Sequence, residues 1–181
     1  ARYSPELLTD ACSQGRKFWA LQLASVWGAR TSARGVASLR EGVEKRIEQL
    51  RGILVDSGLL RPNGKRDTKA AKAHMVAVCE ELGVPVATTD SGDVSLSSDA
   101  CDATEDELLK AYTEYSSMAK TLANDVPMLE KGLVMPLHGH FDLADTGRTT
   151  MAKPNLQNMK RQGLAIRECI VPRGFDERVY A

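Results

Sequence analysis

The segment 32–55 carries the pattern that most restricts how this chain can fold. Its apolar residues recur at intervals of three and four, which aligns them on one face of an α-helix. Charged residues fill many of the other positions, so the segment predicts a helix with one side in a core and the other in solvent. The stripe is too short to indicate a coiled coil. Its apolar residues are Val36, Leu39, Val43, Ile47, Leu50 and Leu54.

Three further helices are predicted from start and stop signals. The first covers 4–26, because Ser4-Pro5-Glu6 supplies an N-cap, a proline at the first helical position and an early acidic residue. The second covers 67–82 and ends at Gly83. The third begins at a capping-box-like sequence and covers 104–124. The acidic, serine-rich stretch 86–103 predicts an irregular loop.

Glycines punctuate short segments after Pro127, and the pattern there favours strands over 133–137, 166–171 and 178–180. The expected fold class is therefore α+β and mainly α. We expect a helical part over 1–130 and a strand-containing part over 131–181.

The charges are balanced in number but not in position. Lys and Arg total 24 and Asp and Glu total 24, giving a formal net charge of zero. The stretch 148–173 is mainly basic and 89–107 is acidic without a basic residue. A basic face could contact phosphates while an acidic face stays in solvent. Aromatic residues are only 5% of the chain, which argues against a base-stacking platform.

A second basic cluster lies in the turn-rich segment 61–72, and two interpretations stay open. It could contact phosphates at the tip of a helical hairpin, or it could serve solubility alone. Its members are Arg61, Lys65, Arg66, Lys69 and Lys72.

The cysteines and histidines indicate no metal site. The four cysteines are widely separated, so no zinc-binding pair is expected, and with no signal-peptide pattern they are typical of a reducing cytoplasm. His138-Gly139-His140 has no nearby cysteine or acidic partner set, which favours a surface feature. No run of about 18 apolar residues occurs, so we expect no membrane span.

One stretch is more specific than any helix. Thr146-Gly147-Arg148 is followed, after five residues, by Pro154-Asn155-Leu156-Gln157-Asn158. This arrangement resembles the TGR…PNLQN signature of family A, or polymerase I-like, DNA polymerases. Downstream, Ile166-Arg167 and the residues to Pro172 resemble a strand of the same family.

Weaker matches to that family occur upstream in the expected order, at 27–30, at 81–85, and at Tyr115 with Lys120. The resemblance implies that 1–130 form the helix leading into the polymerase palm and the helical thumb subdomain. It also implies that 131–181 form the N-terminal strands of the palm. In the family, the strand with the first catalytic Asp follows soon after, so we expect this chain to be truncated before it.

The resemblance implies that this segment binds duplex DNA of any sequence. Phosphates and the minor groove serve that purpose, because every Watson–Crick pair presents N3 or O2 acceptors there. Arginine suits this task through its rigid fork of donors. The resemblance implies that Arg148 reaches the minor groove and that polar neighbours contact the duplex or its backbone. Those neighbours are Thr149, Thr150, Asn155, Gln157, Asn158 and the thumb residue Lys120.

The chain departs from the family after Asn158. The family usually has Ile-Pro and then an arginine that contacts the triphosphate, whereas this chain has Met159-Lys160-Arg161 and a shorter loop. Arg161 is the candidate for the nucleotide or phosphate contact. Such drift is typical of a phage or divergent bacterial polymerase.

The resemblance implies a DNA-directed DNA polymerase as the parent enzyme, acting on primer–template DNA and dNTP. Nucleotidyl transfer in the parent would use Mg²⁺ held by carboxylates outside this chain. We therefore expect no catalytic residue and no bound cofactor here, an inactive fragment, and a monomer. Two alternatives stay open: a stand-alone, non-catalytic DNA-binding module derived from a polymerase, and a helical protein-interaction domain.

Overall fold

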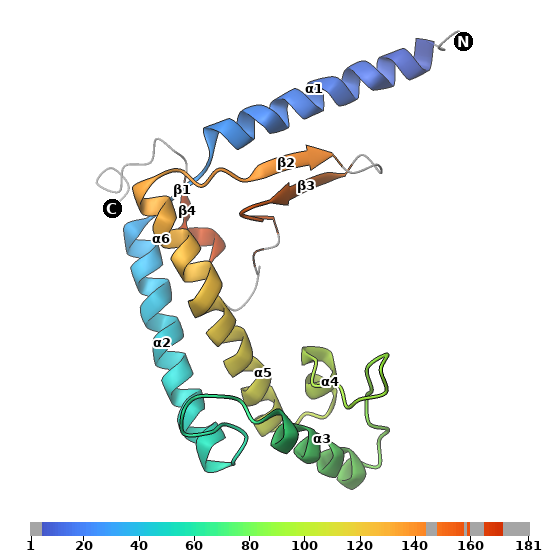
Figure 1. Cartoon of the computed structure of the whole chain (residues 1–181), viewed down its shortest axis with the longest axis vertical. Helices are drawn as coiled ribbons and strands as arrows, with labels where there is room; N and C mark the ends of the chain where they lie inside the picture. Colours follow the sequence, from blue (N-terminus) through green and yellow to red (C-terminus); the bar gives the residue numbers. More distant parts are fainter. Residues whose placement is uncertain (1–4, 144–147, 158, 160–164, 172–181) are drawn as a thin grey trace. The chain divides into compact units, whose positions relative to one another are not determined.

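The computed structural model describes residues 5–143, 148–157, 159 and 165–171 (Figure 1). Helices dominate, and two short antiparallel sheets accompany them, which confirms the expected α+β, mainly α fold class. Across these described residues, no helix is long and apolar enough to span a membrane. The helices are α1 (Pro5–Trp27), α2 (Ala33–Asp56), α3 (Thr68–Leu82), α4 (Ser98–Ala103), α5 (Glu107–Lys120) and α6 (Val126–Val134).

The chain divides into two compact units. Unit 1 combines Ala1–Leu39 with Asp125–Ala181, and unit 2 is Arg40–Asn124. Helix α2 therefore begins in unit 1 and continues in unit 2. The expected subdomain boundary near residue 130 stays a prediction, since a division into compact units is a different measure.

Unit 2 is a helical unit built on the stripe predicted for α2. Leu50 and Leu54 are buried with Leu59, Leu60, Tyr112 and other residues of α3 and α5 in one cluster. A second cluster joins Met75 and Cys79 of α3 to Cys101 and Leu109. Of the six stripe residues, Val36, Leu39, Val43, Leu50 and Leu54 are buried and Ile47 is partly buried. The helical face predicted from spacing is therefore the core-facing side of α2.

The predicted ends of α3 are confirmed. Asp67 is the N-cap, its carboxylate accepting from the backbone N–H of Ala70, and Gly83 ends the helix in the left-handed conformation with φ of 65°. The loop prediction for 86–103 was wrong at its end, because Ser97 caps α4 by accepting from the N–H of Ala100. Helix α5 starts later than predicted, since Asp106 is its N-cap.

Unit 1 holds both sheets. Strand β1 (Arg30–Thr31) pairs with β4 (Ile170–Val171), and β2 (His140–Leu143) pairs with β3 (Thr149–Ala152), each pair antiparallel. Helix α1 lies against β2 (Figure 1). Helix α6 lies against β1, and Thr31 Oγ1 donates a 2.7 Å hydrogen bond to the backbone oxygen of Leu129.

The strand predicted over 133–137 was wrong. A π-helical turn, η1 (Thr121–Asp125), follows α5 and leads into α6, which continues to Val134. Pro127 is the second residue of α6, directly after this π-helical turn. Within 133–137, Leu137 is the one residue that pairs with another segment, through an isolated β-bridge to Ala29.

The strand predicted over 166–171 is shorter than expected. The 3-10 helix η2 (Arg167–Cys169) comes first, and only Ile170–Val171 form a strand. The strand predicted over 178–180 lies outside the described residues.

Candidate nucleic-acid interface

The hairpin of β2 and β3 presents the first residues of the sequence signature. Thr149 pairs with Leu143 and Thr150 with Asp142, and both threonines are exposed. Met151, the next residue, is buried at 7% exposure. Because side chains alternate along a strand, Thr149 lies on the face of Met151 and Thr150 on the opposite face. The hairpin therefore exposes one hydroxyl group on each face and is anchored by the apolar side chain of Met151.

Helix α1 holds this hairpin by its backbone. Ser25 Oγ accepts from the N–H of Phe141 at 3.0 Å, and Gln22 Nε2 donates to the carbonyl of Phe141 at 3.3 Å. His138 Nδ1 lies 3.0 Å from the backbone oxygen of Ser25, directly before the strand. Side chains of α1 thus satisfy backbone groups at the edge of β2 and fix the position of the hairpin.

The loop after β3 folds back over the hairpin. The Asn155 side-chain oxygen accepts from the N–H of Gln157 at 3.1 Å, which makes a tight turn. Gln157 Nε2 donates to Thr149 Oγ1 at 3.3 Å, joining the loop to β3. A Cβ at Gly139 would lie 2.9 Å from the backbone oxygen of Pro154, so the absence of a side chain there lets the loop approach closely.

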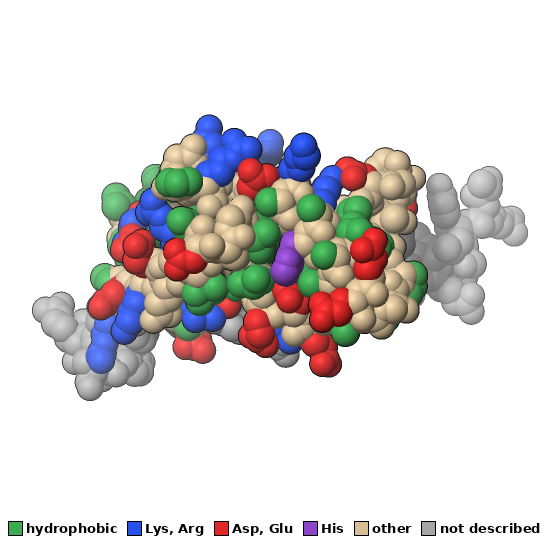
Figure 2. All heavy atoms as spheres, turned by 90° about the horizontal axis from the view of Figure 1, so that it is seen from below, with side chains coloured by type: hydrophobic (Ala, Val, Ile, Leu, Met, Phe, Trp, Pro, Cys, Tyr) green, Lys and Arg blue, Asp and Glu red, His purple; other side chains and the backbone are tan. Residues whose placement is uncertain are grey.

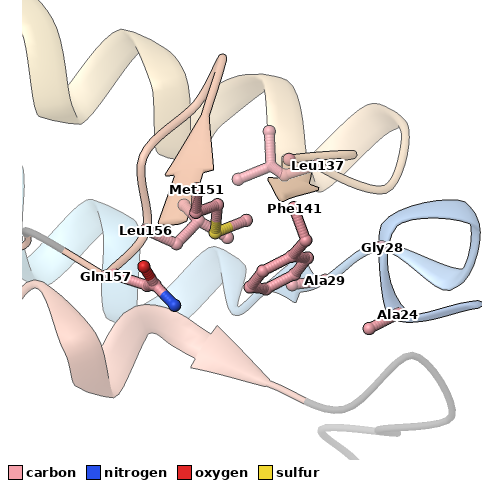
Figure 3. Close-up of a pocket in the computed structure, with 9 residues that line it drawn as sticks. Ala24, Gly28, Ala29, Leu137, Phe141, Met151, Leu156 and Gln157 are labelled. Carbon is pink, nitrogen blue, oxygen red and sulfur yellow. The ribbon is translucent and has the colours of Figure 1, made fainter. Parts of the chain in front are cut away.

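A small apolar pocket lies between α1, the hairpin and this loop (Figure 3). Its volume is about 250 Å³. Leu137, Phe141, Met151 and Leu156 are its large apolar lining residues, and Gln157 is its polar side chain (Figure 3). We assign the pocket no ligand.

The structure brings together part of the predicted site. Arg148, directly before β3, is exposed, as are Asn155 and Gln157. Asn158 and Arg161 lie outside the described residues. Lys120 is exposed in the last turn of α5, in unit 2, whereas the hairpin belongs to unit 1.

The basic cluster at 61–72 is largely engaged within unit 2. Arg61 Nε lies 3.1 Å from Asp67 Oδ2, and Lys72 forms an ion pair with Asp93. The N–H of Ala70 and then Arg61 lower the pKa of the Asp67 carboxyl, and Lys72 lowers that of Asp93.

Arg66 is also occupied, because it donates to Ser116 Oγ at 2.5 Å and lies over the ring of Tyr112. Two of the five basic residues of the cluster, Arg61 and Lys72, are paired with acidic side chains, which favours the solubility interpretation. On the surface in Figure 2, Lys and Arg side chains gather along one border, and Asp and Glu are more frequent toward the opposite border. Lys65 and Lys69 remain exposed candidates for phosphate contact.

The residues described do not fit a metal site. No group of three or more His, Cys, Asp or Glu side chains among them is arranged to hold an ion.

Sequence reasoning missed the residues that hold the site in shape. Gln22 and Ser25 are ordinary helix residues by pattern, and Gly139 lies between two histidines that indicate only a surface feature. The pattern around Arg167 predicts a strand, yet Arg167 donates to the loop carbonyls of Gln157 and Met159. Each acts through the backbone of a distant segment, so spacing along the chain gave no signal.

Comparison with known proteins gives a structural match only. No protein-family profile matches the chain, and no curated protein matches it. A solved structure described as the POL domain of Pol1 from M. smegmatis, in complex with DNA primer-template and dNTP, is similar at a TM-score of 0.56 and 20% sequence identity. The similarity covers 78% of this chain and 26% of that one, about a quarter of its length. This chain therefore has a DNA-polymerase-like fold.

Proposed function

We propose that this chain is the part of a family A DNA-directed DNA polymerase that grips the primer–template duplex. The observation that carries the proposal is that the sequence motif and the supported surface residues occur in the same segment. The described part of the TGR…PNLQN stretch, residues 148–157, lies on a supported strand and loop in a chain of polymerase-like fold, and Arg148, Thr149 and Gln157 are each exposed there. The departures after Asn158 suit a phage or divergent bacterial member.

Each residue has a chemical role in this proposal. Arg148 donates to minor-groove N3 and O2 acceptors, which all correct base pairs share. Thr149 and Thr150 offer hydroxyls to the backbone, and Asn155, Gln157 and Asn158 supply amide groups that donate and accept. Lys120 contacts a phosphate from the thumb, and Arg161 takes the nucleotide or phosphate contact.

The catalytic step belongs elsewhere in the parent enzyme. Two Mg²⁺ ions would activate the primer hydroxyl and stabilise the leaving pyrophosphate there. Among the residues that the structure describes, no group of three or more His, Cys, Asp or Glu side chains could hold a metal ion. We therefore propose no magnesium ligand in this part of the chain. We expect the purified chain to bind duplex DNA and to extend no primer.

The test is the affinity of the 181-residue chain for fluorescein-labelled duplexes of different sequence, measured by anisotropy at several salt concentrations. We expect binding that weakens with salt, with a slope of about −0.9 for each phosphate contacted. Arg148→Ala should weaken binding about tenfold or more and similarly for all sequences, because a hydrogen bond from a charged group contributes about 1.5–3 kcal/mol and the minor-groove acceptors are shared by all base pairs. Arg16→Ala, which removes another exposed arginine of unit 1, is the matched control. Equal affinity of the two variants would contradict the assignment of Arg148.

A second candidate function is protein interaction through α1. The stripe of α2 is used in the chain's own core, but α1 exposes Trp19 at 70%, Leu23 at 65% and Val26 at 73%. These residues are spaced by four and three, so they share one helical face. A chain that self-associates through this face and has no salt-dependent DNA affinity would favour this candidate.

A further inference from the structure

Arg167 lies on a firmly anchored turn. It is the first residue of η2, between Ile166 at 0% exposure and Cys169 at 1%. The backbone oxygen of Cys169 accepts from the N–H of Ser32 at 2.9 Å, next to the start of α2. A Cβ at Gly35 would lie 3.4 Å from the Cα of Cys169, so α2 approaches this turn closely. The base of the Arg167 side chain is therefore fixed by the core of unit 1.

The guanidinium group of Arg167 is directed at the backbone of the loop after β3, which carries Asn155 and Gln157 of the sequence signature and is called the signature loop below. Nε donates to the carbonyl of Met159 at 3.1 Å, and Nη2 donates to the same carbonyl at 3.0 Å. Nη2 also donates to the carbonyl of Gln157 at 3.0 Å. One rigid fork thus holds two carbonyls that are two residues apart. A lysine ammonium lacks the planar fork that makes this arrangement possible.

We propose that Arg167 is a positioning residue for DNA binding, acting through Gln157. The inference rests on the proposed function and deepens it. The direction of a side chain follows from the orientation of its own backbone, and Arg167 fixes the backbone of Gln157 from one side. The hydrogen bond from Gln157 Nε2 to Thr149 fixes the amide from the other side and uses one of its two N–H donors. Together these bonds hold the Gln157 amide in place before the duplex arrives.

The same geometry distinguishes a positioning role for Arg167 from direct contact with a DNA phosphate. Its sequence position, in a basic stretch, would suggest that it neutralises a phosphate. Its hydrogen bonds run instead to neutral carbonyls of its own chain. Removing Arg167 should therefore weaken DNA binding without changing the number of counterions released, and so without changing the salt slope.

The experiment uses the 181-residue chain and the labelled duplex, with Arg167→Lys, Arg167→Ala, Gln157→Ala and the double variant of Gln157→Ala with Arg167→Ala. Arg167→Lys keeps the charge and most of the stem, so it tests the clamp even if Arg167→Ala folds poorly. We expect both Arg167 variants to lose about tenfold in affinity, with the wild-type salt slope. The double variant should bind no more weakly than Gln157→Ala, because Arg167 acts through Gln157 and has nothing to position once that side chain is removed. A low concentration of guanidinium chloride, against equal sodium chloride, should restore binding by Arg167→Ala and leave Gln157→Ala unchanged.

Three results would overturn the inference. Wild-type affinity in both Arg167 variants would exclude a role in DNA binding. A salt slope reduced by about 0.9 in Arg167→Ala, with Arg167→Lys close to wild type, would make Arg167 a direct phosphate contact. Additive losses in the double variant would mean that Arg167 does not act through Gln157. A wild-type chain with no DNA affinity would instead refute the proposed function itself, and this inference with it.

Discussion

The contact between α6 and β1 depends on a glycine, and replacing Gly132 by alanine tests it. Gly132 is buried inside α6, and a Cβ there would lie 2.7 Å from both Cγ2 and Oγ1 of Thr31. Thr31 is 7% exposed, and its hydroxyl donates to Leu129 in the same helix. The new methyl group can be accommodated only by moving Thr31 and disturbing that hydrogen bond.

One favourable effect and two unfavourable effects set the magnitude. Alanine is favoured over glycine in a helix interior by about 1 kcal/mol. Overpacking a filled site costs about 1–3 kcal/mol. Disturbing a buried hydroxyl's hydrogen bond costs about 1–3 kcal/mol more. We therefore expect Gly132→Ala to lower the free energy of unfolding by about 1–5 kcal/mol. Gly42→Ala is the control, since nothing lies within 4 Å of its added Cβ in α2. Helix propensity alone should make Gly42→Ala more stable than wild type.

Urea unfolding followed by circular dichroism measures both variants. Tryptophan fluorescence adds a local probe, because the two tryptophans, Trp19 and Trp27, both lie in α1 of unit 1. The Gly132→Ala transition should move to lower urea in both signals. A Gly132→Ala chain as stable as Gly42→Ala would refute the close α6–β1 contact.

Other parts of the structure make separate predictions. Leu54→Ala should destabilise unit 2 by about 2–5 kcal/mol, since Leu54 is fully buried, and circular dichroism should report the loss at lower urea than tryptophan fluorescence does. Because the folded pKa of Asp67 is lowered from 3.8, its contribution to stability is present above that pH and is lost as pH falls through the folded value; Asp67→Asn should flatten the acid limb of the stability–pH curve. Burial raises the pKa of Cys101 to about 11, and Cys79 and Cys169 are also buried, so a thiol reagent at neutral pH should label exposed Cys12 first and the other three only on unfolding.

The helices could be predicted from sequence because their signals are local. Asp67 and Gly83 mark the ends of α3 through bonds within a few residues, and the stripe of α2 gives its buried face directly. The predictions were wrong where contacts between distant segments determine the local structure. Residues 133–137 have the composition of a strand, but α6 continues to Val134, and Leu129 and Gly132 of this helix contact Thr31. The π-helical turn before Pro127 has no clear signal in the sequence.

The candidate site divides in the same way. The resemblance to a polymerase motif predicts Arg148, Thr149 and Gln157 as DNA contacts, and the hydrogen bond from Gln157 to Thr149 joins two of these residues across eight positions. The support from Ser25 and Arg167 arises from tertiary contacts over long or irregular separations. Residue spacing alone does not encode such contacts.

The most direct test of the central claim is an NMR titration of the ¹⁵N-labelled chain with a short duplex DNA. The account predicts salt-sensitive shifts concentrated in the amides of 148–157, with smaller changes at Arg167, whose bonds support that loop. Shifts that avoid this segment, or no shifts at low salt, would contradict the claim that the chain grips duplex DNA through its signature loop.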